Sequence, residues 1–288
     1  MHDKSAELSA KRAGNLFFLL VVVQIAGVLV YGIAGFFLPG LYEFAVSTVY
    51  SQALMLVPTL LAAACSHLDR RQVFPLRRIR PVQIVLALLM TVAAFPLGSL
   101  LNTLSSLPAG NTAEQMSGEI VRCPMWEMVL LIGLAGPFCE ELVFRGYLFQ
   151  NLKRGNRMVP AAVLSGLLFG LLHLNFNQFV YAAGLGILFA LAAEAGGSLW
   201  ISILMHQAFN TAEVWMMYLP GNNARSAGGA ADPAATGTLA GTDVVRALTI
   251  SPADLLLSAF LAAAGLAVFF LLLKQLRKNA YPETEKEK

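Results

Sequence analysis

The chain has 288 residues, of which 57% are hydrophobic and only 13% are charged. A soluble globular domain carries about 25% charged residues, so this composition excludes an ordinary water-soluble domain and indicates a membrane protein. The formal net charge of +3 is small, and no basic stripe with interleaved aromatic residues is present, so we expect no nucleic-acid partner. Cys65, Cys123 and Cys139 form no metal or disulfide spacing pattern.

Apolar stretches long enough to cross a bilayer recur along the whole chain. A transmembrane helix needs about 20 mainly apolar residues. The stretches that meet this length lie at residues 14–37, 43–65, 82–104, 125–150, 158–174, 176–194, 197–218 and 255–273. We therefore expect an all-α integral membrane protein of about eight transmembrane helices.

The polar stretches set the expected domain boundaries. Residues 1–13 are expected to form a cytoplasmic N-terminal segment, and residues 14–273 the transmembrane domain. Residues 105–124 are polar and contain Pro and Gly, so a loop is predicted there. Residues 220–254 are rich in Ala, Gly, Asn and Thr, which predicts a flexible loop. Residues 274–288 form a charged tail.

The distribution of Lys and Arg predicts the orientation, because these residues favour the cytoplasmic side of short loops. One side of the predicted membrane would hold the basic residues before span one, after spans two and four, and after span eight. They are Lys4, Lys11, Arg12, Arg70, Arg71, Arg77, Arg78, Arg80, Lys153, Arg154, Arg157, Lys274, Arg277 and Lys278. Both termini are therefore expected in the cytoplasm, in the plasma (inner) membrane if the source is bacterial.

Two adjacent acids interrupt the fourth predicted span. Ionisable residues at membrane depth are costly and indicate function. Glu141 and Arg145 are four residues apart with the acid first, which favours an ion pair within one helix. Glu140 is rotated about 100° from Glu141 on a helix and needs a partner from another span. The alternative is that both acids lie at a wet helix end without a function.

Histidines in two later spans are candidate partners. His173 lies near one end of the fifth span, one turn after Phe169. A lone membrane histidine is more often a packed, hydrogen-bonded residue. However, His206 and Asn210 share a face of the seventh span. At about 1.5 Å of rise per residue, Glu140, His173 and His206 would all lie about 13–22 Å from the cytoplasmic ends of their spans, and could share one layer.

Residue types alone leave the reaction open. An acid, two histidines and an amide suit water activation with oxyanion stabilisation. They equally suit a zinc site with two His ligands and one Glu ligand, or a proton relay.

The three motifs together narrow the choice. Glu-Glu-x-x-x-Arg at 140–145, Phe-x-x-x-His at 169–173 and His-x-x-x-Asn at 206–210 resemble those of the CAAX-processing and bacteriocin-immunity (CPBP, or Abi) family of intramembrane endopeptidases, which includes CAAX prenyl protease 2. The resemblance implies an integral-membrane peptidase with a polar catalytic cavity inside the helix bundle. Its catalytic core would lie at about residues 125–218. Its substrate would be a membrane-associated or prenylated protein or peptide, cleaved near the C-terminus.

Roles follow from the same resemblance. Glu140 would be the general base, polarising a water together with His173. His206 and Asn210 would form the oxyanion hole. Glu141, Arg145 and Phe169 would support the site or position the substrate.

Other mechanisms and functions remain open at this point. No cofactor is implied firmly, and zinc ranks second to glutamate-activated water. A cysteine-protease mechanism through Cys139 would need a base, and none lies at helical spacing from Cys139 on its own span. Rival functions are a non-catalytic immunity or scaffold protein and a proton-coupled transporter. The sequence has no evident internal repeat to support the transporter.

Overall fold

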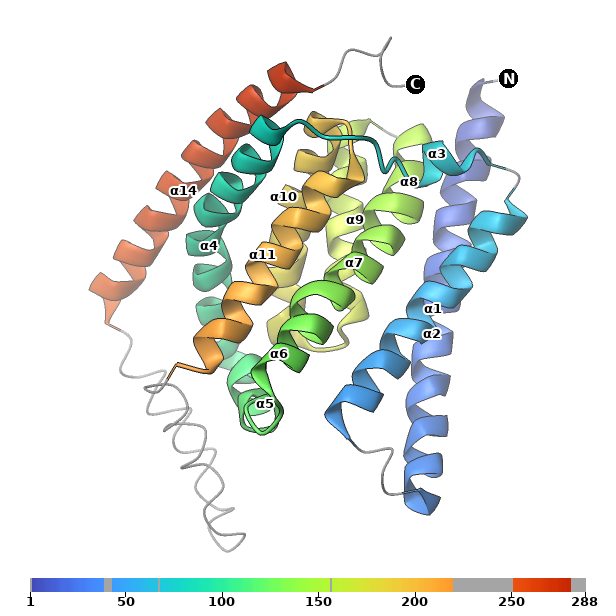
Figure 1. The fold of residues 1–288 in the computed structure, drawn as a ribbon. Coiled ribbons are helices and arrows are strands. Elements are labelled where there is room, and N and C mark those ends of the chain that lie inside the picture. Colours follow the sequence, from blue (N-terminus) through green and yellow to red (C-terminus); the bar gives the residue numbers. More distant parts are fainter. Residues whose placement is uncertain (1, 39–42, 67, 156, 220–250, 281–288) are drawn as a thin grey trace, which may run out of the picture.

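The structure, a computed structural model, describes residues 2–38, 43–66, 68–155, 157–219 and 251–280. Every regular element in these ranges is a helix (Figure 1). The expected all-α class is therefore confirmed. The predicted flexible loop at 220–254 lies almost entirely outside the described residues.

Most of the long helices begin and end within about six residues of the predicted spans, although the first begins twelve residues earlier than predicted. The long helices are α1 (His2–Phe37), α2 (Phe44–Cys65), α4 (Pro81–Ala109), α9 (Met158–Leu172), α10 (Phe176–Gly196), α11 (Leu199–Met217) and α14 (Pro252–Asn279). Within the described ranges, five helices are long and apolar enough to cross a membrane: Leu8–Phe37, α2, α4, α10 and α14. The protein is thus a multi-pass membrane protein, while the count of eight spans stays a prediction.

The fourth predicted span is one continuous helical run that contains two segments of a different register. It consists of α6 (Met125–Met128), η2 (Val129–Ala135), α7 (Gly136–Glu141), η3 (Leu142–Leu148) and α8 (Phe149–Gly155). The η2 and η3 segments are π-helical. In this register a backbone N–H bonds the carbonyl five residues earlier, as Gly136 does to Leu131. Such insertions are frequent at functional sites.

The prediction of a polar loop at residues 105–124 is wrong. Helix α4 continues to Ala109, and α5 (Thr112–Ile120) follows. One polar side chain of this stretch, Ser105, is satisfied by hydrogen bonds inside the fold. The Ser105 hydroxyl bonds carbonyls of its own helix, and Asn177 of α10 donates to Ser105 Oγ at 2.9 Å and to Asn102 at 3.0 Å. A buried polar residue paired with another helix has the same composition signal as a loop residue.

The helices pack side by side, with α14 against α4 at one flank and α1 with α2 at the other (Figure 1). Between them, α9 and α10 approach closely at small residues. A Cβ added at Gly166 would lie 2.8 Å from the Ala183 carbonyl oxygen, so the absence of a side chain there lets the two helices approach closely. Large apolar side chains such as Phe18 (71% exposed) and Phe260 (69%) face outward, as lipid contact requires.

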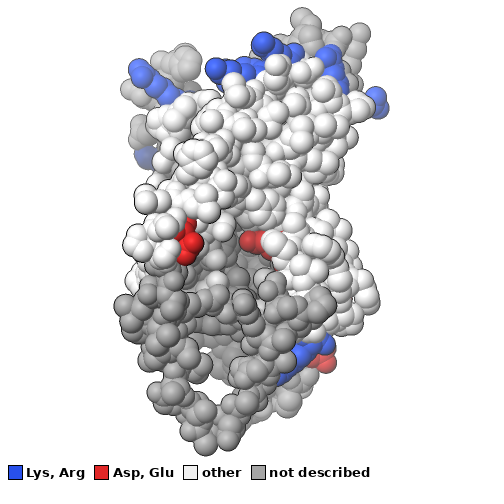
Figure 2. Space-filling view, turned by 90° about the vertical axis from the view of Figure 1, so that its left-hand side faces the viewer, with Lys and Arg blue, Asp and Glu red and all other residues white. Residues whose placement is uncertain are grey.

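The remaining element, α3 (Arg70–Val73), belongs to the connection between α2 and α4. In Figure 1 it lies at the same end of the bundle as the His2 end of α1 and the Asn279 end of α14. Lys and Arg side chains gather mainly over this end (Figure 2). We call it the basic end. Its cytoplasmic orientation remains the prediction made from the loop charges.

Candidate active site

Glu141 and Arg145 form an ion pair with no exposure to solvent. The expected contact is present at 2.8 Å between Arg145 Nη1 and Glu141 Oε1, and both side chains are 0% exposed. The guanidinium carbon of Arg145 lies 4.5 Å from the centre of the Phe169 ring, a cation–π arrangement. A buried charge pair survives only with such close partners, because removing two ions from water is expensive.

A glycine on α10 makes room for this pair. A Cβ added at Gly186 would lie 2.7 Å from Arg145 Nη2 and 3.0 Å from Phe169. We expect Gly186→Ala to lower the melting temperature of the purified protein, because the arginine or the Phe169 ring must move. The matched control is Gly14→Ala on α1, where an added Cβ meets nothing within 4 Å. That change should stabilise the helix by about 0.5–1 kcal/mol. Equal melting temperatures for the two variants would contradict the close fit at Gly186.

His206 connects the two acids from α11. Its Nδ1 lies 3.0 Å from Glu141 Oε1, and its Nε2 lies 3.6 Å from Glu140 Oε2. The first separation is a hydrogen bond, whereas the second is too long for one. Since Nδ1 faces a carboxylate, Nδ1 carries a proton. Nε2 and Glu140 attract each other only if a proton is present on one of them. His206 therefore bonds Glu141 directly, whereas its Nε2 only faces Glu140.

Glu140 differs from Glu141 in exposure and in partners. Its side chain is 17% exposed, against 0% for Glu141. Gln52, on α2, donates its Nε2 to Glu140 Oε1 at 3.2 Å. One acid is therefore dry and ion-paired, while the other is partly exposed and held by a neutral amide.

Gln52 is a site residue that sequence reasoning missed. A signal existed: a glutamine inside an apolar span of some 20 residues must find a polar partner. Gln52 lies 88 positions from Glu140 in the sequence, so the sequence did not indicate that Glu140 is its partner. Gln52 Oε1 is buried and has no hydrogen-bond partner among the described residues. The Gln52 amide rests against Gly136, one turn before Glu140.

His173 lies at the C-terminal end of α9, beside Phe169. Its Nδ1 is 2.9 Å from the Phe169 carbonyl oxygen. A carbonyl only accepts hydrogen bonds, so Nδ1 bears the proton and the lone pair of a neutral ring lies on Nε2. The Phe169 ring contacts both histidines, with centroids 5.0 Å from His173 and 5.6 Å from His206. The structure thus gathers both histidines around Phe169. Among the described residues it shows no hydrogen bond or ion pair between His173 and Glu140.

Asn210 contacts the backbone of the helix that carries the acids. Its Nδ2 donates to the Ile132 carbonyl at 3.3 Å. In the π register this carbonyl would pair with the N–H of Pro137, which proline lacks. Asn210 replaces the missing donor. An asparagine amide has two N–H groups, so a second donor remains for a ligand.

A metal site does not form from these groups as they stand. No group of three His, Cys, Asp or Glu side chains in the described ranges is placed to hold a metal ion. Nδ1 of His206 is bound to Glu141, and Nδ1 of His173 to a backbone carbonyl. Metal-binding histidines commonly donate Nδ1–H in this way and coordinate through Nε2, so these bonds do not exclude zinc held by Glu140, His173 and His206. That alternative stays a prediction, and we derive no step through a metal. Cys139 packs against the apolar core around Phe144 and Phe169.

Comparison with known proteins agrees with the motifs. Residues 123–212 match the family described as Type II CAAX prenyl endopeptidase Rce1-like. The chain is 27% identical over 96 residues to the "Putative membrane peptidase YdiL" of Bacillus subtilis (strain 168), covering 33% of this chain and 39% of that protein. It is 33% identical over 88 residues to the "Membrane-embedded CAAX protease MroQ" of Staphylococcus aureus (strain USA300), covering 28% and 36%. No solved structure matches.

The matched segment contains every predicted site residue, whereas Gln52 lies outside it. Each match spans less than two fifths of the curated relative. The resemblance to the CAAX-processing family, inferred from three motifs, is confirmed over this segment.

Proposed function

We propose that this protein is an intramembrane endopeptidase that hydrolyses a peptide bond with water activated by Glu140. The observation that carries the proposal is the division of labour between adjacent acids. Glu141 is dry and paired with Arg145 and His206, while Glu140 is partly exposed and faces a histidine from another helix. The match of this same segment to a membrane peptidase family supports it.

In this mechanism Glu140 is the general base. A water oxygen attacks the scissile carbonyl carbon as its proton passes to Glu140, and the lone pair on His173 Nε2 helps to orient the water. The proton then moves from Glu140 to the leaving amine nitrogen when the C–N bond breaks. Gln52 fixes the carboxylate, so that the same oxygen faces the water throughout.

The oxyanion that forms on the carbonyl oxygen requires hydrogen-bond donors. We assign this role to His206 and Asn210, which are one turn apart on α11. His206 Nε2 lies 3.6 Å from Glu140 Oε2, too far for a hydrogen bond, so this nitrogen can bond the oxyanion. Asn210 has a second N–H for the same purpose. Glu141 and Arg145 hold His206 and Phe169 in place without contacting the reacting atoms.

The proposed substrate is a membrane-associated or prenylated protein cleaved near its C-terminus. We expect purified protein in lipid nanodiscs to cleave a fluorescent peptide with a C-terminal prenylated CAAX sequence faster than the same peptide without the lipid. If neither peptide is cleaved, a non-catalytic scaffold is the better-supported function. Uptake of protons into sealed vesicles without cleavage would favour the transporter.

Glutamate-activated water also predicts the outcome of metal removal. We expect hydrolysis to persist after dialysis against a chelator, with no stoichiometric metal detected by elemental analysis. Tightly bound metal whose removal abolishes cleavage, and whose return restores it, would reverse the assignment in favour of zinc.

A further prediction concerns Gln52. Gln52→Leu should lower kcat about 10- to 150-fold, as expected for one hydrogen bond to a charged group, of about 1.5–3 kcal/mol, with little change in KM. The matched control is Gln24→Leu, an amide of the neighbouring helix α1 that donates to the Ser51 carbonyl at 3.4 Å. An unchanged pH profile and kcat for Gln52→Leu would remove Gln52 from the site.

A further inference from the structure

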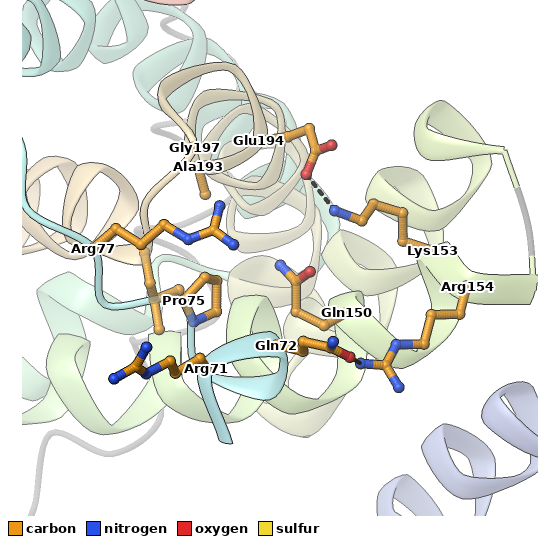
Figure 3. Close-up of a pocket in the computed structure, with 11 residues that line it drawn as sticks. Arg71, Gln72, Pro75, Arg77, Gln150, Lys153, Arg154, Ala193, Glu194 and Gly197 are labelled. Carbon is orange, nitrogen blue, oxygen red and sulfur yellow. Dashed lines mark hydrogen bonds and ion pairs between the residues drawn. The ribbon is translucent and has the colours of Figure 1, made fainter. Parts of the chain in front are cut away.

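The basic end of the molecule contains a cavity away from the candidate active site. It measures about 320 Å³ and lies between α3, the connection to α4, the end of α8 and the turn between α10 and α11 (Figure 3). Four cations and one acid line it: Arg71, Arg77, Lys153, Arg154 and Glu194. Its lining therefore has a formal charge of +3, from four positive groups and one negative group.

Two of these cations are already compensated or partnered. Lys153 Nζ lies 2.7 Å from Glu194 Oε2, and Arg154 donates to Gln72 at 2.8 Å. By contrast, the Arg77 side chain has no ion pair or hydrogen bond with any part of the chain that the structure describes. Figure 3 shows the Arg77 guanidinium directed across the cavity toward the Gln150 amide and the Lys153–Glu194 pair. A guanidinium without a counter-charge inside a cavity has N–H groups available to bind an anion.

Backbone contacts fix the position of Arg77. Ser198 donates its hydroxyl to the Arg77 carbonyl at 2.7 Å, and the Leu199 N–H bonds the Pro75 carbonyl at 2.9 Å. The segment carrying Arg77 is thereby attached to the start of α11. A donor held by its backbone loses less entropy on binding.

This cavity is separate from the candidate active site. Glu140 and Gln150 are ten residues apart on one helical run, which would span about 15 Å as a continuous α-helix and somewhat less here, because η3 between them is π-helical. Three extended residues span at most about 11 Å, so the C-terminal tripeptide of a CAAX substrate would not bridge that distance. The buried side chains of Leu142, Leu199 and Ile203 pack together between the two places, and Leu199 also lines the cavity.

The chemistry favours a phosphate group. Guanidinium groups bind phosphate oxygens with paired, charge-assisted hydrogen bonds. A volume of about 320 Å³ is at the small end for ligand pockets and exceeds one phosphate, so a phosphate ester of a small polar alcohol fits. Basic pockets at the cytoplasmic end of membrane helices meet anionic headgroups. We propose that this cavity binds a glycerophosphate group, supplied by an anionic phospholipid or by a soluble phosphate ester.

The test uses the full-length protein, and its readout is binding, so that it does not depend on the proposed peptidase activity. The melting temperature is measured in phosphatidylcholine nanodiscs, with and without phosphatidylglycerol. It is measured again with soluble glycerol 3-phosphate against sodium chloride of equal ionic strength. A ligand that binds the folded state raises the melting temperature. Stabilisation by phosphatidylglycerol alone identifies a lipid site, and stabilisation by glycerol 3-phosphate identifies a soluble ligand.

Arg77→Gln should raise the ligand concentration at half-saturation about tenfold or more, since it removes a charge-assisted contact. Arg78→Gln is the matched control, because Arg78 is exposed in the same connection and does not line the cavity. If Arg77→Gln is not monodisperse, Arg71→Gln replaces it with the same expected result. Stabilisation by neither probe, or equal loss in the cavity and control variants, would overturn the proposal.

Discussion

Glu140→Gln is expected to reduce kcat for peptide hydrolysis by about 10²–10⁴-fold, the usual contribution of a general base. Glutamine keeps the shape of the side chain and can still contact Gln52, but it cannot accept a proton from water. KM should change little, because the proposed role of Glu140 concerns the transition state. Single-turnover cleavage of a lipidated peptide in nanodiscs is the measurement.

The control for this prediction is Glu127→Gln, an acid on the same helical run and three residues after the Pro124 N-cap of α6. It should retain wild-type kcat. The two variants should also share the wild-type melting temperature, since Glu140 is partly exposed and its amide partner tolerates the exchange. Wild-type turnover by Glu140→Gln would remove the proposed base and, with it, the mechanism.

Arg145→Met is expected to destabilise the protein by about 3–5 kcal/mol, the usual cost of leaving one member of a buried ion pair without its partner. Glu141 and Arg145 are both 0% exposed and 2.8 Å apart. Methionine would fill part of the volume over the Phe169 ring but would leave the Glu141 carboxylate without its cation. Unfolding in denaturant, followed in detergent micelles, measures the loss.

A double replacement separates charge from packing. Glu141→Gln combined with Arg145→Met should recover part of the stability, because no unpaired charge remains. The matched control is Arg122→Met, which removes an exposed Glu119–Arg122 pair of 3.0 Å with side chains 66% and 65% exposed. It should cost about 0–1 kcal/mol. Equal effects of the buried and exposed replacements would contradict the assignment of Glu141–Arg145 as a dry structural pair.

Local patterns predicted the helices well. The predicted spans at 43–65 and 176–194 differ from α2 and α10 by at most two residues at each end, because apolar length is a property of the chain itself. The polar, Pro- and Gly-containing stretch at 105–124 predicted a loop wrongly, because a polar group such as the Ser105 hydroxyl can be satisfied by another helix. Composition reports that a polar group exists and does not report where its partner lies.

The candidate site likewise contains features that the sequence predicted and features that it did not. The Glu141–Arg145 pair follows from a spacing of four residues, and the likeness to membrane peptidases follows from three short motifs. The partners of Glu140 did not follow. Sequence reasoning assigned it His173, whereas the structure places Gln52 and His206 beside it. The general-base role itself stays a prediction until hydrolysis is measured.

The sequence by itself determined the membrane setting, the helical class, the family motifs and the pairing within one helix turn. These depend on residue type and on spacings of a few residues, which the helix geometry converts directly into neighbours. Only the tertiary structure decided which acid is dry, that His206 stands between both acids, and that Asn210 replaces the N–H that Pro137 lacks. The contacts of His206 and Asn210 join residues 65 to 78 positions apart. They depend on how the helices rotate and slide against one another, which packing sets and no local spacing records.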